Sequence, residues 1–534
     1  NATLYYTDGA ATTTSLLGGG SATIGGTVSA GSVPYAASTD TLADGFDFKL
    51  DNNSLWFGVT PASISTAQDS VYVGINAGAD ATTGDYNVGM GRRALQNSTT
   101  GQRNTAIGFS ASRYNTTGTN NVAIGMEALR NTIGHTYNVA IGSNSMLSVG
   151  GNVAGNVAVG AFSLYYPSGN YNTALGYSAL KGASAGTVTA YSNVAIGRAS
   201  MEDITSGHSN VAAGYGAGQT LTTGYYNTYL GKDAGSGSTT THSNVGIGLS
   251  ALSSAHGASN VAIGRSALSN TLGANQVAVG YAALESNSSG EENTAVGYYT
   301  LQANTTGNYN TTMGHQALTA NVHGDYNTAI GHKALYTYAP ADGAGYSTAV
   351  GTQALYSTTT GIHNTAVGAL AGYDLTTGQY NVLMGVSAGA NITGSEQNVI
   401  LGAYAGRMLQ GSKRLIAIGY EAAYMSPSGY QVAIGYGALF SPTTSTENIA
   451  IGTDALRGAA SSTAQYNIAI GNYALDAVTN ALYNVSIGRE SLSTNTTGDS
   501  NIAIGYQAGY ANTIGGDNVA IGKNAMLGNT TTNY

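Results

Sequence analysis

The sequence contains no cysteine, which excludes disulfides and cysteine metal sites and leaves the redox compartment undecided. Only 8% of its 534 residues are charged, the net charge is -9, and no segment concentrates lysine and arginine. Nucleic-acid-binding proteins carry a basic patch, so we expect no nucleic acid as a partner. No apolar run approaches the roughly 20 residues of a membrane-spanning helix. We therefore expect no membrane insertion either.

Large apolar side chains are scarce as well, with six Phe and one Trp against 77 Gly. A chain of this composition cannot build a wide apolar core. It must instead pair its polar groups in hydrogen-bond patterns that recur along the chain. The regular β-branched positions described next argue against disorder, which a Gly-rich and Ser-rich composition would otherwise suggest.

What the sequence does contain is one short repeat. The pentapeptide Asn-Val-Ala-Ile-Gly at 121–125 returns in related form 28 times between residues 54 and 522, most often every 17 residues. A repeat of this period grows by stacking, so the length does not require several globular domains. We predict an irregular N-terminal lead-in or attachment segment at 1–53, a repeat shaft at 54–526 and a C-terminal tail at 527–534.

The pentapeptide is typical of a strand. We number positions from its first residue, so that Asn121 is position 1 and Gly125 is position 5. Position 2 is Val, Ile or Thr in every copy except Leu55, and position 4 is apolar throughout. β-branched residues at alternating sites predict a strand. We assign the side chains at these positions, such as Val122 and Ile124, to the core. Position 3 is Ala in 19 of 28 copies and position 5 is always Gly. We assign Ala123 and Gly125 to a flat outer face that packs closely against a neighbouring subunit.

The rest of each unit closes the coil. Positions 8 and 9 are usually Ala followed by Leu or Gly, which predicts a second short strand or a bend with another apolar column. A polar arc that often reads Thr-Thr-Gly follows, and we expect its glycine to adopt a positive φ in a turn. Gly and β-branched residues in every unit disfavour helix. We predict an all-β fold, a parallel β-solenoid or β-roll of about 28 coils of 17 residues.

Two columns of side chains follow from this stacking. Position 1 is Asn in 22 of 28 copies, and stacked amides can donate to one neighbouring coil and accept from the other. A ligand-binding row of amides is the alternative. The residue before position 1 is Tyr in eleven copies, which indicates packing with a solvated hydroxyl or, alternatively, aromatic faces for sugars. The predicted structural ladder includes Asn104, Asn121, Asn138, Asn293, Asn327, Asn501 and Asn518.

No catalytic, cofactor-binding or metal site is predicted. The eight histidines include no His-x-His pair, and we assign them to exposed polar positions. The glycines recur at the solenoid period without the Gly-Lys-Ser/Thr ending of a phosphate loop. The scattered acidic residues leave one enzymatic alternative open, a carboxylate pair that cleaves glycosides in an intersubunit groove.

The longest coils are the candidates for recognition, because inserts in a solenoid project as surface loops. They span residues 181–191 and 336–346, with a shorter one at 457–466. We expect them to contact a host-surface glycan or protein. The candidate contact residues are Lys181, Thr187, Tyr191, Tyr336, Tyr338 and Tyr346.

The pattern Asn-Val-Ala-Ile-Gly-x-x-Ala, led by Thr-Thr-Gly-x-Tyr-Asn, resembles the head repeats of trimeric autotransporter adhesins. Those repeats form a left-handed parallel β-roll in a homotrimer. The pattern is still more similar to the longer-period repeats of bacteriophage tail fibres, and residues 31–58 resemble segments that precede them. The resemblance covers about residues 31–526. Adhesin coils are shorter, which leaves handedness and cross-section open.

The resemblance implies a homotrimeric rod, the shaft of an extracellular virion tail fibre that takes part in host attachment. Its implied partners are two further copies of itself, a host-surface receptor and a tail or baseplate protein at one end, with no cofactor. Related phage fibres often end in a self-cleaving chaperone domain, and the end of this sequence at Tyr534 is compatible with cleavage of such a domain after trimer assembly. A bacterial surface adhesin or filament subunit is the first alternative. A polysaccharide-degrading tailspike is the second.

Overall fold

A computed structural model describes most of the chain beyond residue 66. The described residues are 4–7, 13–16, 47–51, 54–58, 67–531 and 533, with gaps at 132, 148–151, 167–168, 184–188, 255, 410, 412, 426–429, 442–445 and 459–461. They belong to two compact units, Asn1–Asn227 and Thr228–Tyr534. The division between the units falls inside the segment 54–526 that we predict as the shaft. Thr187 lies outside the described residues.

The first unit opens with two antiparallel pairs of strands. Strand β1 (Leu4–Thr7) pairs with β2 (Thr13–Leu16), and β3 (Asp47–Asp51) pairs with β4 (Ser54–Gly58). The second pair joins residue Asp51 of β3 to Ser54 of β4 at its closed end. Strand β4 also pairs in parallel with β5 (Val71–Val73), so the hairpin leads directly into the repeat.

The remaining strands have three residues each and follow the pentapeptide copies. In the first unit they are β6 (Val88–Met90), β7 (Thr105–Ile107), β8 (Val122–Ile124), β9 (Val139–Ile141), β10 (Val157–Val159), β11 (Thr173–Leu175), β12 (Val194–Ile196) and β13 (Val211–Ala213). In the second unit they are β14 (Thr228–Leu230), β15 (Val245–Ile247), β16 (Val261–Ile263), β17 (Val277–Val279), β18 (Thr294–Val296), β19 (Thr311–Met313), β20 (Thr328–Ile330), β21 (Thr348–Val350), β22 (Thr365–Val367), β23 (Val382–Met384), β24 (Val399–Leu401), β25 (Ile416–Ile418), β26 (Val432–Ile434), β27 (Ile449–Ile451), β28 (Ile468–Ile470), β29 (Val485–Ile487), β30 (Ile502–Ile504) and β31 (Val519–Ile521).

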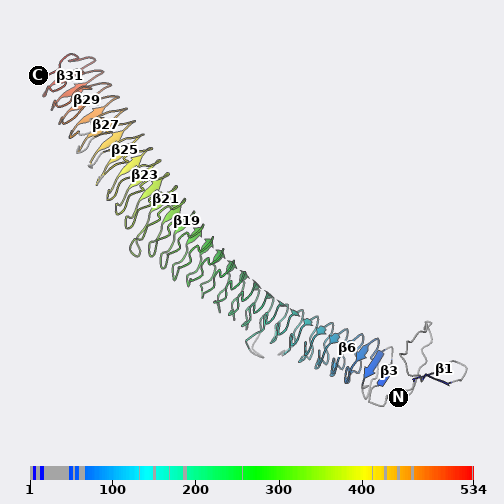
Figure 1. Cartoon of the computed structure of the whole chain (residues 1–534). Coiled ribbons are helices and arrows are strands. Elements are labelled where there is room, and N and C mark those ends of the chain that lie inside the picture. The colour runs from blue at the N-terminus through cyan, green and yellow to red at the C-terminus, as the bar shows by residue number, and fades with distance from the viewer. Residues whose placement is uncertain are drawn as a thin grey trace. The chain divides into compact units, whose positions relative to one another are not determined.

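From β4 onward, each strand within a unit pairs in parallel with the next strand along the chain. The register places equivalent positions on one another, as with Ala123 of β8 and Ala140 of β9. Figure 1 shows the strands of each unit as successive rungs of a stack. The 28 strands β4–β31 coincide with the 28 copies of the pentapeptide, and the described residues contain no helix. The predicted all-β parallel solenoid is therefore confirmed, while its handedness and oligomeric state stay predictions.

The assignment of side chains to the two faces of the strand is wrong. In every strand from β5 to β31 the middle residue is buried, and the residues on either side of it are not. Ala123 is 1% exposed, whereas Val122 and Ile124 are only partly buried. The alternation is as predicted, but its direction is reversed. A coil of 17 residues encloses so little space that the small side chain faces inward and the β-branched pair stays outside.

The interior is filled from the turn that follows the strand. Ala128 and Leu129, at positions 8 and 9, are completely buried, as the apolar column at these positions predicts. They belong to a turn, which is the bend and not the second strand of our prediction. Leu129 has a φ of 52°, a left-handed conformation that is rare for a branched side chain. The turn thus stores backbone strain in order to direct a leucine inward.

Where the inward residue is large, smaller residues around it make room for its side chain. Tyr229 replaces the usual Ala at position 3 and is fully buried. Gly235 and Gly246 lie against its ring, and a Cβ added at Gly246 would come within 3.1 Å of that ring. Tyr72 is accommodated in the same way by Gly78 and Gly89, where added Cβ atoms would lie 2.5 and 2.8 Å away. Each of these two tyrosines at position 3 is therefore accompanied by glycines where its ring packs.

Position 5 needs glycine for a reason internal to the chain. Gly125 has a φ of +132°, and a Cβ added there would lie 2.6 Å from the carbonyl oxygen of Gly142 in the next coil. L-residues rarely adopt this φ. The role predicted for Gly125, close packing against another subunit, is thus wrong, because the neighbour it approaches is the next coil of its own chain.

The glycine of the Thr-Thr-Gly arc also differs from our expectation. Gly118 does not have a positive φ, and a side chain there would meet Asn115 and the carbonyl of His135. The positive φ falls instead on the residue just before position 1, as at Tyr137 with 60°. The arc glycine is therefore explained by close stacking of coils.

Candidate functional site

The asparagines at position 1 form hydrogen-bonded rows that run from coil to coil in the interior. The Oδ1 of Asn104 accepts hydrogen bonds from the backbone N–H and the Nδ2 of Asn121, at 3.1 and 3.0 Å. The Nδ2 of Asn121 also donates to the carbonyl of His135 at 2.7 Å. Every amide atom therefore has a partner. The same pattern recurs at the other asparagines of the predicted ladder, which are Asn138, Asn293, Asn327, Asn501 and Asn518.

These asparagines are buried, and their amides already bond to protein atoms on both sides. The row therefore leaves no open edge for a ligand, which argues against the alternative of an amide binding row. Gln276 interrupts it: its Nε2 donates to the carbonyl of Gly290, but its buried Oε1 has no partner. The extra methylene of glutamine shifts the amide out of register with the asparagines.

A second ladder was not predicted. The Nδ2 of Asn304 donates to the Oδ1 of Asn287, and the Nδ2 of Asn321 donates to the Oδ1 of Asn304, both at 2.8 Å. All three residues are buried at position 12. The signal available in the sequence is an Asn-x-x-Gly pattern that recurs at the arc, as in residues 304–307.

Aromatic rings form columns on the outside of the second unit. Just before position 1, Tyr309, Tyr326, Tyr346, His363 and Tyr380 stack in sequence with ring centroids 4.8 to 5.3 Å apart. Each inner ring is covered on both faces by its neighbours, so only edges and hydroxyls meet solvent. The column therefore fits packing with a solvated hydroxyl, and sugar stacking has no open ring face inside it.

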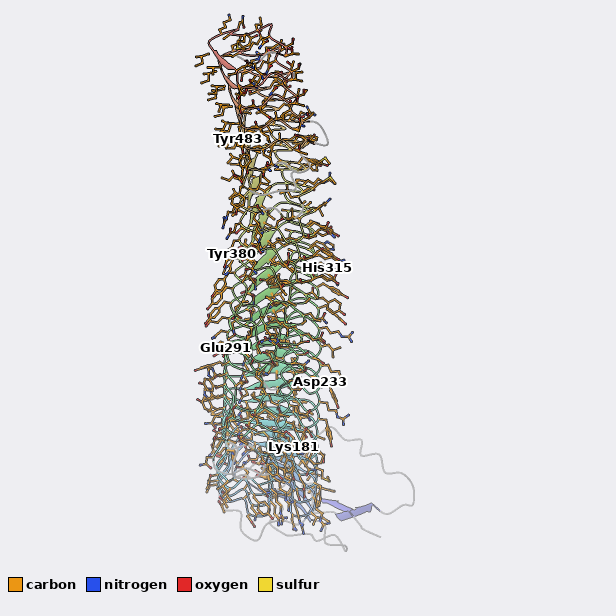
Figure 2. All side chains as sticks on the ribbon, turned by 90° about the vertical axis from the view of Figure 1, so that its left-hand side faces the viewer. Lys181, Asp233, Glu291, His315, Tyr380 and Tyr483 are labelled. Atoms are coloured by element: carbon orange, nitrogen blue, oxygen red, sulfur yellow. The ribbon has the colours of Figure 1, made fainter. Side chains whose placement is uncertain are left out.

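A matching column stands at position 6 and consists of Tyr281, Tyr298, His315 and His332, with centroids 5.1 to 5.4 Å apart. Figure 2 shows that the strands of the second unit lie between the two columns, with Tyr380 on one side and His315 on the other. The strand surface is thus bordered by aromatic side chains along both edges.

The surface between these columns is partly exposed, with apolar side chains at position 4 of every strand and threonine at position 2 of β18–β22. We call the side chains at positions 2 and 4 of β5–β31 the outer strand face. Ile124 and its equivalents are half-buried, and several are more open, with Met313 reaching 52% exposure. Monomeric soluble proteins seldom expose a continuous apolar surface of this kind. Other open members are Met90, Ile107, Leu175 and Ile196 in the first unit and Ile263, Met384 and Ile504 in the second.

One predicted receptor contact, Tyr338, is wrong. Its side chain is fully buried, its hydroxyl lies 3.4 Å from the Oγ of Ser347, and burial raises its pKa to about 12. Tyr338 stands at position 12 and fills the interior where other coils place Asn or Leu. The insert lengthens the coil without turning this ring outward.

The other candidates remain on the surface but in two different units. Lys181 forms an ion pair with Glu202, with the Nζ and Oε1 3.6 Å apart, and Tyr191 stacks on His208 at 4.7 Å. In the second unit Tyr336 stacks on Tyr356 at 5.2 Å, and Tyr346 belongs to the column described above.

Two surface grooves lie on the turn side of the first unit. One, of about 390 Å³, is lined mostly by apolar atoms of Tyr114, Thr116, Asn131 and Ile133. The other, of about 320 Å³, has both polar and apolar walls. It combines side chains from two successive coils, Phe162, Tyr165 and Tyr166 from one and Tyr177, Ser178 and Lys181 from the next. Of these residues only Lys181 was predicted, because the predicted contacts came from the inserts of the longest coils, and the other residues all precede the insert at 181–191.

Two histidines are buried, which contradicts their assignment to exposed positions. The Nδ1 of His135 accepts a hydrogen bond from the N–H of Val153 at 2.8 Å, and burial lowers its pKa to about 4. His256 lies 3.0 Å from the hydroxyl of Tyr229, and burial lowers its pKa also. His135 occupies the place of the arc glycine, a departure from the repeat that was visible in the sequence.

The described residues hold no cluster of three or more His, Cys, Asp or Glu side chains placed to bind a metal ion. Among the same residues we find no helix with the length and apolar character to cross a membrane. The fold and these surfaces define a parallel β-solenoid repeat protein. No protein-family model matches the chain, and comparison with curated proteins gives no match either.

Proposed function

We propose that this chain is a non-enzymatic structural protein, the shaft of a homotrimeric phage tail fibre that takes part in host attachment outside the cell. The observation that carries the proposal is the outer strand face, an apolar surface repeated on coil after coil. A solenoid with this face is suited to lengthwise assembly with further copies. The resemblance of the repeat to phage fibre and adhesin repeats supplies the biological setting.

In this proposal the contact between chains lies on the outer strand face and not on the side of Ala123, where the sequence had suggested it. Parallel sheets are normally covered on both faces, and here the coil interior covers only the Ala123 side. Burial of apolar surface contributes roughly 25 cal/mol per Å², so a small gain at each coil adds up along the stack. Three copies that turn Val122, Ile124 and their equivalents toward a common axis would bury these columns together.

Attachment is tested with the purified full chain. We expect it to compete with phage for adsorption to the host, and gold-labelled antibody against it to mark virion tails in electron micrographs. Label on the bacterial surface in the absence of phage would favour the adhesin alternative. The proposal is refuted if the purified chain does not reduce phage adsorption and the antibody does not label virions.

A further inference from the structure

We propose that the groove lined by Phe162, Tyr165, Tyr166, Tyr177, Ser178 and Lys181 binds a pyranose sugar. This inference rests on the proposed attachment function and names the chemical class that the fibre recognises. We call this site the aromatic groove.

The rings of the aromatic groove differ from the columns in their packing. Tyr177 meets Phe162 at 73°, and Tyr165 meets Phe162 at 47°, with centroids 5.8 and 5.7 Å apart. Tyr165 and Tyr166 are almost perpendicular, at 85°. Rings at such angles meet edge to face, so each contact covers a face of only one of the two rings, and Tyr177 stays 52% exposed. The rings of Tyr336 and Tyr356, which are 7° apart, instead cover each other face to face. The groove thus offers the flat aromatic surface that the C–H face of a pyranose packs against.

The polar part of the groove suits the hydroxyls of a sugar. The Nζ of Lys181 lies 3.6 Å from the Oε1 of Glu202, which is an ion pair longer than a normal hydrogen bond. The ammonium group can therefore donate to a ligand while it stays near its partner. Ser178 and the tyrosine hydroxyls provide further donors and acceptors. A volume of about 320 Å³ lies at the lower end of small-molecule sites, which fits one or two pyranose rings.

The neighbouring groove lacks this combination. A cation borders a ring of each groove: the guanidinium carbon of Arg198 lies 5.8 Å from the centre of the Tyr177 ring in the aromatic groove, and those of Arg113 and Arg130 lie 4.7 and 5.9 Å from the centre of the Tyr114 ring in the neighbouring groove. The neighbouring groove differs in its walls. Its lining is mostly apolar and offers few partners for hydroxyls. Apart from Tyr177 at position 6, the residues of the aromatic groove stand further along the turn that follows the strand and do not belong to the outer strand face.

The test uses the full chain and a panel of defined pyranosides, both neutral and carrying a carboxylate, on a glycan array and by saturation-transfer NMR. We expect binding to at least one pyranoside. Tyr165→Ala and Tyr177→Ala should each weaken it about tenfold, the equivalent of one aromatic contact. Tyr165→Phe keeps the ring and should keep most of the affinity. Lys181→Gln should weaken carboxylated sugars more than neutral ones.

Tyr356→Ala is the matched control, because Tyr356 stands at the same coil position as Tyr165 but inside a parallel column. It should leave sugar binding unchanged. The inference is overturned if the folded wild type binds no pyranoside, or if both alanine variants in the groove bind as well as the wild type. Host attachment is measured on the same samples. Attachment without sugar binding refutes only the groove, and sugar binding without attachment refutes only the attachment function.

Discussion

At the scale of the residue, Asn121 shows how one side chain joins its coil to both neighbours. Its Oδ1 accepts from Asn138, and its Nδ2 donates to Asn104 and to the carbonyl of His135. The asparagine repeated at position 1 made this ladder predictable, because a buried amide that recurs in register needs partners of its own kind.

Asn121→Ala removes these bonds and leaves buried partners unpaired, so we expect the free energy of unfolding to fall by about 2–4 kcal/mol. Gln276→Asn should act in the opposite direction and raise it by about 1 kcal/mol, because the partnerless Oε1 is replaced by an amide in register. Denaturant unfolding measures both changes. Equal stability of the wild type and both variants would contradict the ladder.

Comparing substitutions at Gly125 and Gly522 distinguishes the cost of backbone strain from the cost of a steric clash. Both have a φ between 119° and 132°, but an added Cβ meets the next coil only at Gly125 and meets nothing within 4 Å at Gly522. We expect Gly125→Ala to destabilise the fold by about 3 kcal/mol or more and Gly522→Ala by about 1–2 kcal/mol. Denaturant melts of the two variants decide the matter, and equal losses would show that stacking does not require the glycine.

His135 makes stability depend on pH. Its pKa falls from 6.5 to about 4 in the folded chain, because burial disfavours the imidazolium. The unfolded chain therefore takes up the proton first as the pH falls. Stability from this group is complete above pH 6.5 and is lost between pH 6.5 and 4, by on the order of 3 kcal/mol. His135→Gln should flatten that part of the curve when melting is followed across this range. An unchanged slope in the variant would assign the acid sensitivity elsewhere.

At the scale of the element, the size of the inward strand side chain in a coil is matched to the size of a turn side chain. Ala123 at position 3 faces Leu129 at position 9, whereas Leu383 at position 3 goes with Gly389 at position 9, where an added Cβ would lie 3.1 Å from Leu383. The pair shares one narrow space, so a gain in volume at one position requires a loss at the other.

Ala123→Leu should therefore destabilise the fold by about 1–3 kcal/mol through overpacking. The double variant Ala123→Leu/Leu129→Gly recreates the arrangement of Leu383 and Gly389, and we expect it to regain part of that loss. A double-mutant cycle measured by denaturant unfolding tests this coupling. Additive effects would show that the two positions do not share the interior.

The sequence could predict the strand, the register and the coil period, because period-2 alternation and a 17-residue repeat specify them. It could not show which side of the strand faces inward, since alternation is the same for both. That choice depends on how tightly the coil closes, through the positive φ at Gly125 and Leu129. The aromatic groove was equally hidden, because the angle at which the rings of Phe162 and Tyr177 meet depends on side-chain packing between two coils.

At the scale of the whole molecule, the account depends on the outer strand face. A single chain leaves Ile124, Ile141 and their equivalents partly open to water along the stack. In the proposed trimer, identical copies would remove this surface from water. The central claim is therefore that three chains assemble through this face.

The most direct test is the mass of the purified full chain in native mass spectrometry, beside the variant Ile124→Asp/Ile141→Asp. A Thr117→Asp variant on the exposed arc serves as the control. We predict three times the chain mass of 53.7 kDa for the wild type and the control, and loss of the trimer in the double variant. A folded wild-type chain at 53.7 kDa would contradict the account.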